Sequence, residues 1–197
     1  MQDIREIYLL ISPYFSFLLN QNGKKPYHYV LQNSITEASK SKGIFGFIVL
    51  DEVAYTSNKE YDLSLKNHAL KNFGEDRIRI ARLKTLSTQF FYDKTIAQRL
   101  VDPEKIKVTA RGTYTLRGVM EGIRHLIDAY NIPSKNAFIN LQESIDGGRI
   151  MVDKKFFQTL PELIDIEKTT AEVGLDYLIE WKSKRIEVLK KLGLSFA

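Results

Sequence analysis

Apolar residues recur along the chain at two spacings, one typical of helices and the other typical of strands. Helical spacing predicts helices over residues 3–21 and 117–130. Two short runs rich in aromatic and β-branched residues, 27–31 and 44–50, predict strands, the second of them buried. Helices and strands are therefore both expected.

The middle of the chain has a pattern of its own. Residues 62–73 are helical in spacing, residues 77–87 predict a basic amphipathic helix, and residues 95–101 predict a shorter one. Two alternating stretches then flank Gly112, and this arrangement predicts a β-hairpin over residues 106–116 with the glycine in its turn. The expected order is helix, short helix, hairpin and helix.

These elements together predict a predominantly helical α+β fold. We expect an N-terminal α/β portion over residues 1–73, a basic central segment over 74–131 and a C-terminal helical portion over 132–197. An apolar stripe in the last portion suits packing on the chain's own core, and it equally suits a homodimer formed through this helix. The stripe consists of Leu175, Leu178, Ile179, Trp181, Ile186, Leu189 and Leu192.

Composition narrows the class of protein. The chain has 197 residues, 44% hydrophobic and 27% charged, which is the balance of an ordinary globular protein. It has no cysteine and three widely separated histidines, so disulfides, cysteine nucleophiles and thiolate metal sites are excluded, and no metal or cofactor is expected. The N-terminus lacks a basic region, and the apolar run 7–19 is too short to cross a bilayer. We expect no membrane association and a cytoplasmic location.

The formal net charge of +5 is concentrated in the middle of the chain. Residues 1–60 hold six basic and six acidic side chains, whereas residues 77–117 hold ten basic and three acidic ones, a net charge of +7. Such a block attracts a polyanion through counterion release and long-range steering, which predicts nucleic-acid binding, with DNA favoured. The candidate binding residues are Arg77, Arg79, Arg82, Lys84, Lys94, Arg99, Lys105, Lys107, Arg111 and Arg117.

The same stretch resembles the winged-helix DNA-binding domains, in whose wing a hydrophobic-Thr-x-x-Gly-x-Tyr-x-Leu pattern is frequent. The residues that match are Val108, Thr109, Gly112, Tyr114 and Leu116. By this resemblance, residues 95–101 would occupy the recognition-helix position, and Lys107 and Arg111 would reach phosphate or a minor groove. Arg111 is then expected to be exposed at the hairpin tip, and Gly112 to adopt a positive φ.

Asp51 and Glu52 follow the apolar residues 47–50 and resemble the Walker B segment of P-loop ATPases, in which the aspartate acts on magnesium and the glutamate polarises water. The chain contains no Gly-x-x-x-x-Gly-Lys-Ser/Thr loop, so we expect no nucleotide hydrolysis. The same two carboxylates leave open a magnesium-dependent nuclease, with Lys59 or Lys66 downstream.

The histidines predict no catalytic site. Glu121 lies four residues before His125, at helical spacing, and no nucleophile accompanies that pair. We interpret His68 and His125 as structural.

The leading hypothesis is a nucleic-acid-binding protein without catalysis, such as a DNA-binding regulator or a replication or maintenance factor. It would act by phosphate neutralisation through the basic central segment. The alternative is a non-catalytic protein–protein assembly module whose basic surface docks an acidic partner. A nuclease that uses Asp51 and Glu52 is the third hypothesis.

Overall fold

The computed structural model describes residues 3–11, 27–51, 55–83, 85–113, 118–145 and 172–180, together with Ser183 and Glu187. The strands in these residues are β1 (Glu6–Ile11), β2 (Ile44–Asp51), β3 (Ile78–Leu83), β4 (Lys107–Thr113), β5 (Ala137–Ile145) and β6 (Glu172–Gly174). The α-helices are α1 (Tyr27–Ser39), α2 (Tyr55–Phe73), α3 (Thr88–Phe91), α4 (Lys94–Ala97) and α5 (Met120–Tyr130).

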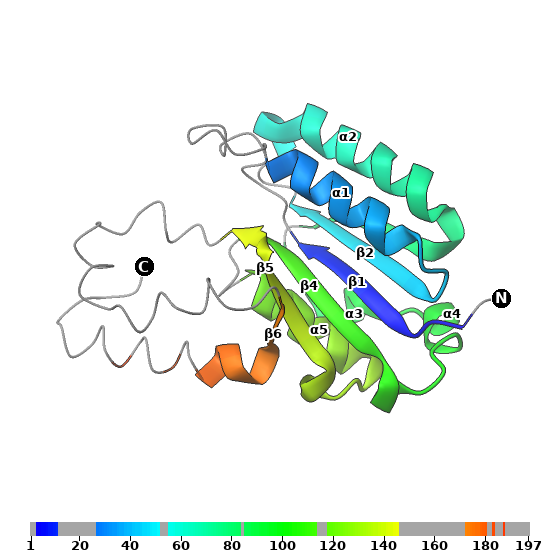
Figure 1. Ribbon diagram of the computed structural model, residues 1–197, viewed down its shortest axis with the longest axis vertical. Coiled ribbons are helices and arrows are strands. Elements are labelled where there is room, and N and C mark those ends of the chain that lie inside the picture. Colours follow the sequence, from blue (N-terminus) through cyan, green and yellow to red (C-terminus); the bar gives the residue numbers. More distant parts are fainter. Residues whose placement is uncertain are drawn as a thin grey trace.

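The strands of the described residues form one sheet in the order β3-β2-β1-β4-β5-β6. The first five are parallel to their neighbours, and β6 runs antiparallel to β5. Figure 1 shows α1 and α2 on one face of this sheet and α3 and α5 on the other. The fold is therefore a three-layer α/β arrangement.

The helices change face because the strand order reverses. From β1 the chain adds β2 and then β3 in one direction, and it returns to place β4 on the other side of β1. Parallel crossovers are right-handed, so strands added in opposite directions send their helices to opposite faces of the sheet. An open parallel sheet with this reversal has the doubly wound, Rossmann-like topology.

The expectation of a predominantly helical α+β fold is wrong. Residues 3–21 were expected to form a helix, but residues 6–11 form the central strand β1. Residues 77–87 were expected to form an amphipathic helix, and residues 78–83 form the edge strand β3. In both segments apolar side chains are spaced in a way that also fits a helix. Strand β1 is buried between two helical layers and has no polar face to mark it. Strand β3 is half-exposed, but its two arginines lie on opposite faces, so neither face is uniformly polar.

The expected β-hairpin over residues 106–116 is a single strand as far as the chain is described. Strand β4 runs without a turn through Gly112, and it pairs with β1 on one side and β5 on the other. The short helix of the winged-helix interpretation is limited to α4, which precedes β4. The described residues thus contain neither the wing nor a helix of the expected length.

Two of the other expected elements are confirmed, and two are wrong. The buried strand over residues 44–50 is confirmed as β2, and the helix over 117–130 is confirmed as α5. The strand expected over residues 27–31 is wrong, because these residues begin α1. Strands β5 and β6 lie in the segment 132–197, which was expected to be helical, and the sheet includes strands from all three expected portions of the chain.

Two apolar cores flank the sheet. One lies between the sheet and α3 and α5 and includes Phe47, Phe91 and Ile123. The other lies under α1 and α2 and includes Leu10 and Ile35. Strand β1 contributes to both cores because its alternate side chains point to opposite faces, and its residues 7–11 are all buried.

The two halves of the sheet meet at Gly112. This glycine pairs with Ile11 at the end of β1 and has a φ of 139°, a region that L side chains rarely adopt. A Cβ atom at this position would overlap the backbone carbonyl of Ile11, which cannot move without displacing β1. The positive φ expected from the sequence is confirmed, but it serves strand packing rather than a turn.

We expect Gly112→Ala to destabilise the protein by about 3 kcal/mol or more, because backbone strain and a clash with β1 add together. Gly174→Ala is the matched control, since a Cβ there meets no atom within 4 Å. Urea unfolding of both variants measures the difference. Equal, small effects would contradict the close approach of β1 and β4.

Candidate functional site

The order of the strands reverses between β1 and β4. These two parallel strands both end at the carboxyl edge of the sheet. Helix α1 begins after β1 and α5 begins after β4, so the N-termini of these two helices are on the same edge but on opposite faces. Carboxyl edges of this kind are the usual ligand sites of open α/β sheets. The candidate site therefore consists of the described residues around this edge.

A buried ion pair lies beneath this edge on the α1 face. Arg111 of β4 is 6% exposed, and its Nε atom lies 2.6 Å from Oε2 of Glu143 on β5. The approach is that of an ion pair without the angle of a hydrogen bond. The guanidinium also lies over the ring of Tyr8, 3.8 Å from its centroid. The expectation that Arg111 is exposed at a hairpin tip is wrong.

Ser34 connects helix α1 to this pair. Its hydroxyl donates a hydrogen bond of 2.7 Å to Oε2 of Glu143, and it lies 3.1 Å from the hydroxyl of Tyr8 on β1. Burial raises the pKa of Tyr8, against the opposing effect of the Arg111 charge, so the phenol keeps its proton. Tyr8 can therefore donate to Ser34, which donates to Glu143. The network ties α1 to three strands.

An irregularity in β5 aims Glu143 at Arg111. Ala110 pairs with Ile139, but Gly112 pairs with Ser144, so β5 has extra residues between these two positions. Asn140 holds this bulge, because its Oδ1 accepts a hydrogen bond of 3.1 Å from the backbone N–H of Glu143. Bulges redirect side chains in this way and are frequent near functional sites.

The basic residues expected to bind nucleic acid do not gather on one surface of the described structure. Arg79 and Arg82 lie on opposite faces of β3. Arg79 is 3.3 Å from Asp93, and Arg82 is 3.3 Å from Asp62 of α2. The positive charge of each is balanced by a carboxylate on its own face.

Two further arginines have structural partners. Arg77 donates to the backbone carbonyl of Phe73 at 3.0 Å and to two carbonyls at and just beyond the end of α1, and Arg99 donates to the carbonyl of Asp76 at 2.9 Å. These bonds satisfy carbonyl groups at helix ends and turns. Lys84 and Arg117 lie outside the described residues.

The lysines of the window are more exposed. Lys105 and Lys107 lie 3.2 Å and 2.7 Å from the carboxylates of Asp102 and Glu172, and Lys94 is exposed on α4. Exposed pairs of this kind contribute little to stability. The described basic residues of the window are thus dispersed over both faces of the sheet.

The histidines have hydrogen-bond partners that the sequence pattern did not reveal. Thr88 Oγ1 lies 3.0 Å from Nδ1 of His125, and Glu121 lies 3.8 Å from its Nε2 atom. Likewise, Thr36 Oγ1 lies 2.9 Å from Nε2 of His68. Both threonines come from other helices, so spacing along the sequence could not identify them.

The described residues give little information on the carboxylates Asp51 and Glu52, which were expected to bind magnesium in the nuclease hypothesis. Asp51 is the last residue of β2, and Glu52 and Tyr114 lie outside the described residues. Among the residues described, no three histidine or acidic side chains are grouped to hold a metal ion, and no helix has the length and apolarity needed to span a membrane.

The C-terminal apolar stripe is described only in part. Leu175 and Leu178 are buried in this chain's own core, and Ile179 packs against it. Trp181, Ile186, Leu189 and Leu192 lie outside the described residues or have side chains that are not described. The homodimer through this helix stays a prediction.

We expect Arg111→Met to lower the free energy of unfolding by about 3 kcal/mol, because it leaves Glu143 largely buried without its counter-charge. Arg79→Met is the matched control. It breaks a pair whose side chains are each 37% exposed and should cost less than about 1 kcal/mol. Urea unfolding compares the two, and adding Glu143→Leu to Arg111→Met should recover part of the loss. Similar losses of unfolding free energy in both single variants would show that the buried pair contributes no more to stability than an exposed one.

Comparison with known proteins adds no relative to this description. No family model, no curated protein and no solved structure matches the chain.

Proposed function

We propose that the chain binds a phosphate-bearing ligand of the nucleotide class at the carboxyl edge of the sheet, between β1 and β4. The observation that carries this proposal is the reversal of strand order at that position. In open α/β sheets, the loops that follow the two strands on either side of such a reversal diverge to opposite faces. Ligands bind between them.

The N-terminus of α5 favours a phosphate group. This helix follows β4 along the chain, and the helical conformation already includes residues 118 and 119, where Val119 has αR backbone angles. The dipole of this helix favours an anion at its N-terminal end. Helix α5 also approaches β1 closely, because a Cβ atom at Gly122 would overlap the side chain of Ile11. That contact brings the helix N-terminus towards the end of β1.

The buried network supports the same edge from below. Arg111 and Glu143 neutralise each other, so they contribute position rather than net charge. Through Ser34 they fix α1 against β4 and β5. A preformed site loses less conformational entropy when its ligand binds.

We expect ADP to bind the full chain with one-to-one stoichiometry, as measured by isothermal titration calorimetry at low salt. Glu121 lies in the first turn of α5 and is exposed, so Glu121→Gln should tighten ADP binding about two- to fivefold by removing a competing negative charge. Asp128→Asn makes the same change near the other end of this helix and should leave affinity unchanged. Absence of saturable ADP binding, or an equal response of both variants, would contradict the proposal.

The charge surplus favours a second candidate, binding of nucleic acid through its phosphates. The +7 window of residues 77–117 supports it, and the exposed lysines Lys94 and Lys105 are the described members best able to reach a polyanion. This mode would be sequence-independent. It uses side chains outside the β1–β4 edge.

For this second candidate we expect duplex DNA affinity to fall with salt at a log–log slope of roughly −4 to −5 if about five phosphates are contacted. Lys94→Gln and Lys105→Gln should each reduce the magnitude of the slope by about one, whereas Lys71→Gln on α2 should not. Fluorescence anisotropy with labelled duplex at several salt concentrations measures the slopes. Binding that ignored a fourfold change in salt would rule out phosphate neutralisation.

A further inference from the structure

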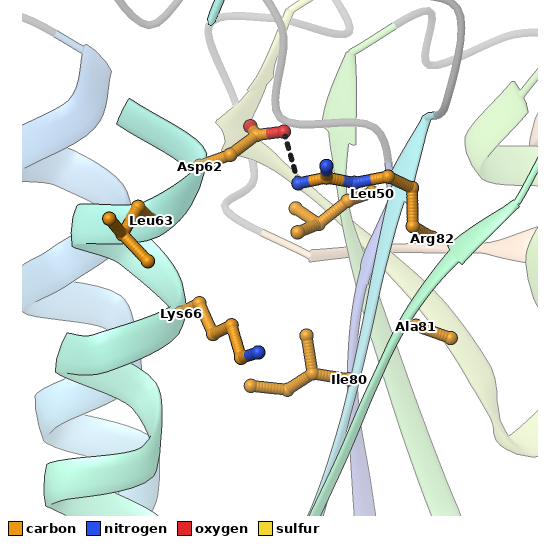
Figure 2. Close-up of a pocket in the computed structure, with 7 residues that line it drawn as sticks. All are labelled: Leu50, Asp62, Leu63, Lys66, Ile80, Ala81 and Arg82. Carbon is orange, nitrogen blue, oxygen red and sulfur yellow. Dashed lines mark hydrogen bonds and ion pairs between the residues drawn. The ribbon is translucent and has the colours of Figure 1, made fainter. Parts of the chain in front are cut away.

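A cavity of about 340 Å³ lies between helix α2 and the edge strand β3, away from the reversal between β1 and β4. This volume is at the lower end of the range, about 300–1,000 Å³, in which small-molecule sites are found. Figure 2 shows the residues that line it: Leu50, Asp62, Leu63, Lys66, Ile80, Ala81 and Arg82.

The walls of this α2–β3 cavity are mainly apolar. Leu50 of β2 is 3% exposed, and Ile80 of β3 is half-buried beside it. Leu63 of α2 closes the outer side, where it is 54% exposed. A large aliphatic side chain left this exposed at the rim of a cavity gains from an apolar ligand that covers it.

The charged groups at the cavity leave one positive charge in excess. Asp62, whose side chain is 10% exposed, lies 3.3 Å from Arg82, so these two side chains neutralise each other at one end. Lys66 follows Asp62 by one helical turn, and Figure 2 shows its ammonium group directed across the cavity towards Ile80. No described residue forms an ion pair with Lys66.

We propose that the α2–β3 cavity binds a small amphipathic carboxylate, with its carboxylate group at Lys66 and its apolar body against Leu50, Leu63 and Ile80. A single anionic group matches Lys66, the lining cation that forms no ion pair with a described residue. The apolar walls suit an aliphatic body, and Asp62 and Arg82 at one end already partner each other. An ammonium head group would meet Lys66, and a neutral alcohol would leave its charge unpaired.

This site is independent of the proposed phosphate site. Strands β2 and β1 separate β3 from β4 in the sheet, and no residue that lines the cavity belongs to β4 or α5. Failure of one proposal therefore leaves the other unaffected.

Isothermal titration calorimetry of the full chain with octanoate tests the proposal, with hexanoate, octanol and octyltrimethylammonium as comparison probes. We expect octanoate to bind saturably with one-to-one stoichiometry and up to about 15-fold more tightly than hexanoate, since each buried methylene contributes about a fourfold gain. Octanol should bind more weakly than octanoate, and the cation should not bind. Equal binding of all three eight-carbon probes, or no saturable octanoate binding, would overturn the proposal.

Variants on α2 locate the site. Lys66→Met keeps an apolar stem but removes the charge and should weaken octanoate binding at least fivefold, whereas Lys71→Met, on the same helix but outside the cavity, should not. Leu63→Glu places a carboxylate in the exposed wall and should abolish binding without loss of folding, which circular dichroism checks. If Lys71→Met weakens octanoate binding as much as Lys66→Met, binding depends on the net charge of the protein, and the assignment to the α2–β3 cavity is wrong.

Discussion

The backbone contact between β1 and β4 determines the arrangement of the rest of the molecule. At Gly112 the two strands approach so closely that a side chain would displace the carbonyl of Ile11. Because β4 pairs with β1 rather than with β3, strand order reverses there and the helices divide between two faces. Each face then has its own apolar core, and both cores include side chains of β1.

The buried network stabilises the same junction by electrostatic means. Arg111 comes from β4, Glu143 from β5, Ser34 from α1 and Tyr8 from β1, so a single connected group of polar side chains joins four elements. Removal of one partner from such a group costs more than its individual hydrogen bonds suggest. The bulge in β5 is the structural cost of bringing Glu143 into position.

Elements were predicted correctly where the local pattern of apolar residues fits only a helix or only a strand. Residues 44–50 are too short and too apolar for a surface helix, and α5 has a clear apolar stripe, so both were predicted correctly. Residues 6–11 were not, because a buried parallel strand has no alternation to mark it. Residues 78–83 were not, because Arg79 and Arg82 are three residues apart, a spacing that also fits a helix, and in the strand they point to opposite faces. Gly112 was recognised as a special backbone position, but its role depends on Ile11, which is about a hundred residues away in the sequence.

Most of the candidate site could not be predicted from the sequence, because its residues have partners that are far away along the chain. Arg111 was singled out for its charge, and nothing near it in the sequence indicates that Glu143 neutralises it. Net charge per segment also mispredicts a surface when alternate residues of one strand face opposite sides, as Arg79 and Arg82 do. Partners such as Ser34 and Thr88 are uncharged and common, so only the folded structure brings them to notice.

The most direct measurement is a nuclear magnetic resonance titration of the full, nitrogen-15-labelled chain with ADP. If the edge between β1 and β4 binds phosphate, amide shifts should concentrate at Gly112 and at residues 119–121, with little change at the other end of α5. Shifts that concentrate instead along β3 and α2, or an absence of shifts at saturating ADP, would contradict the account.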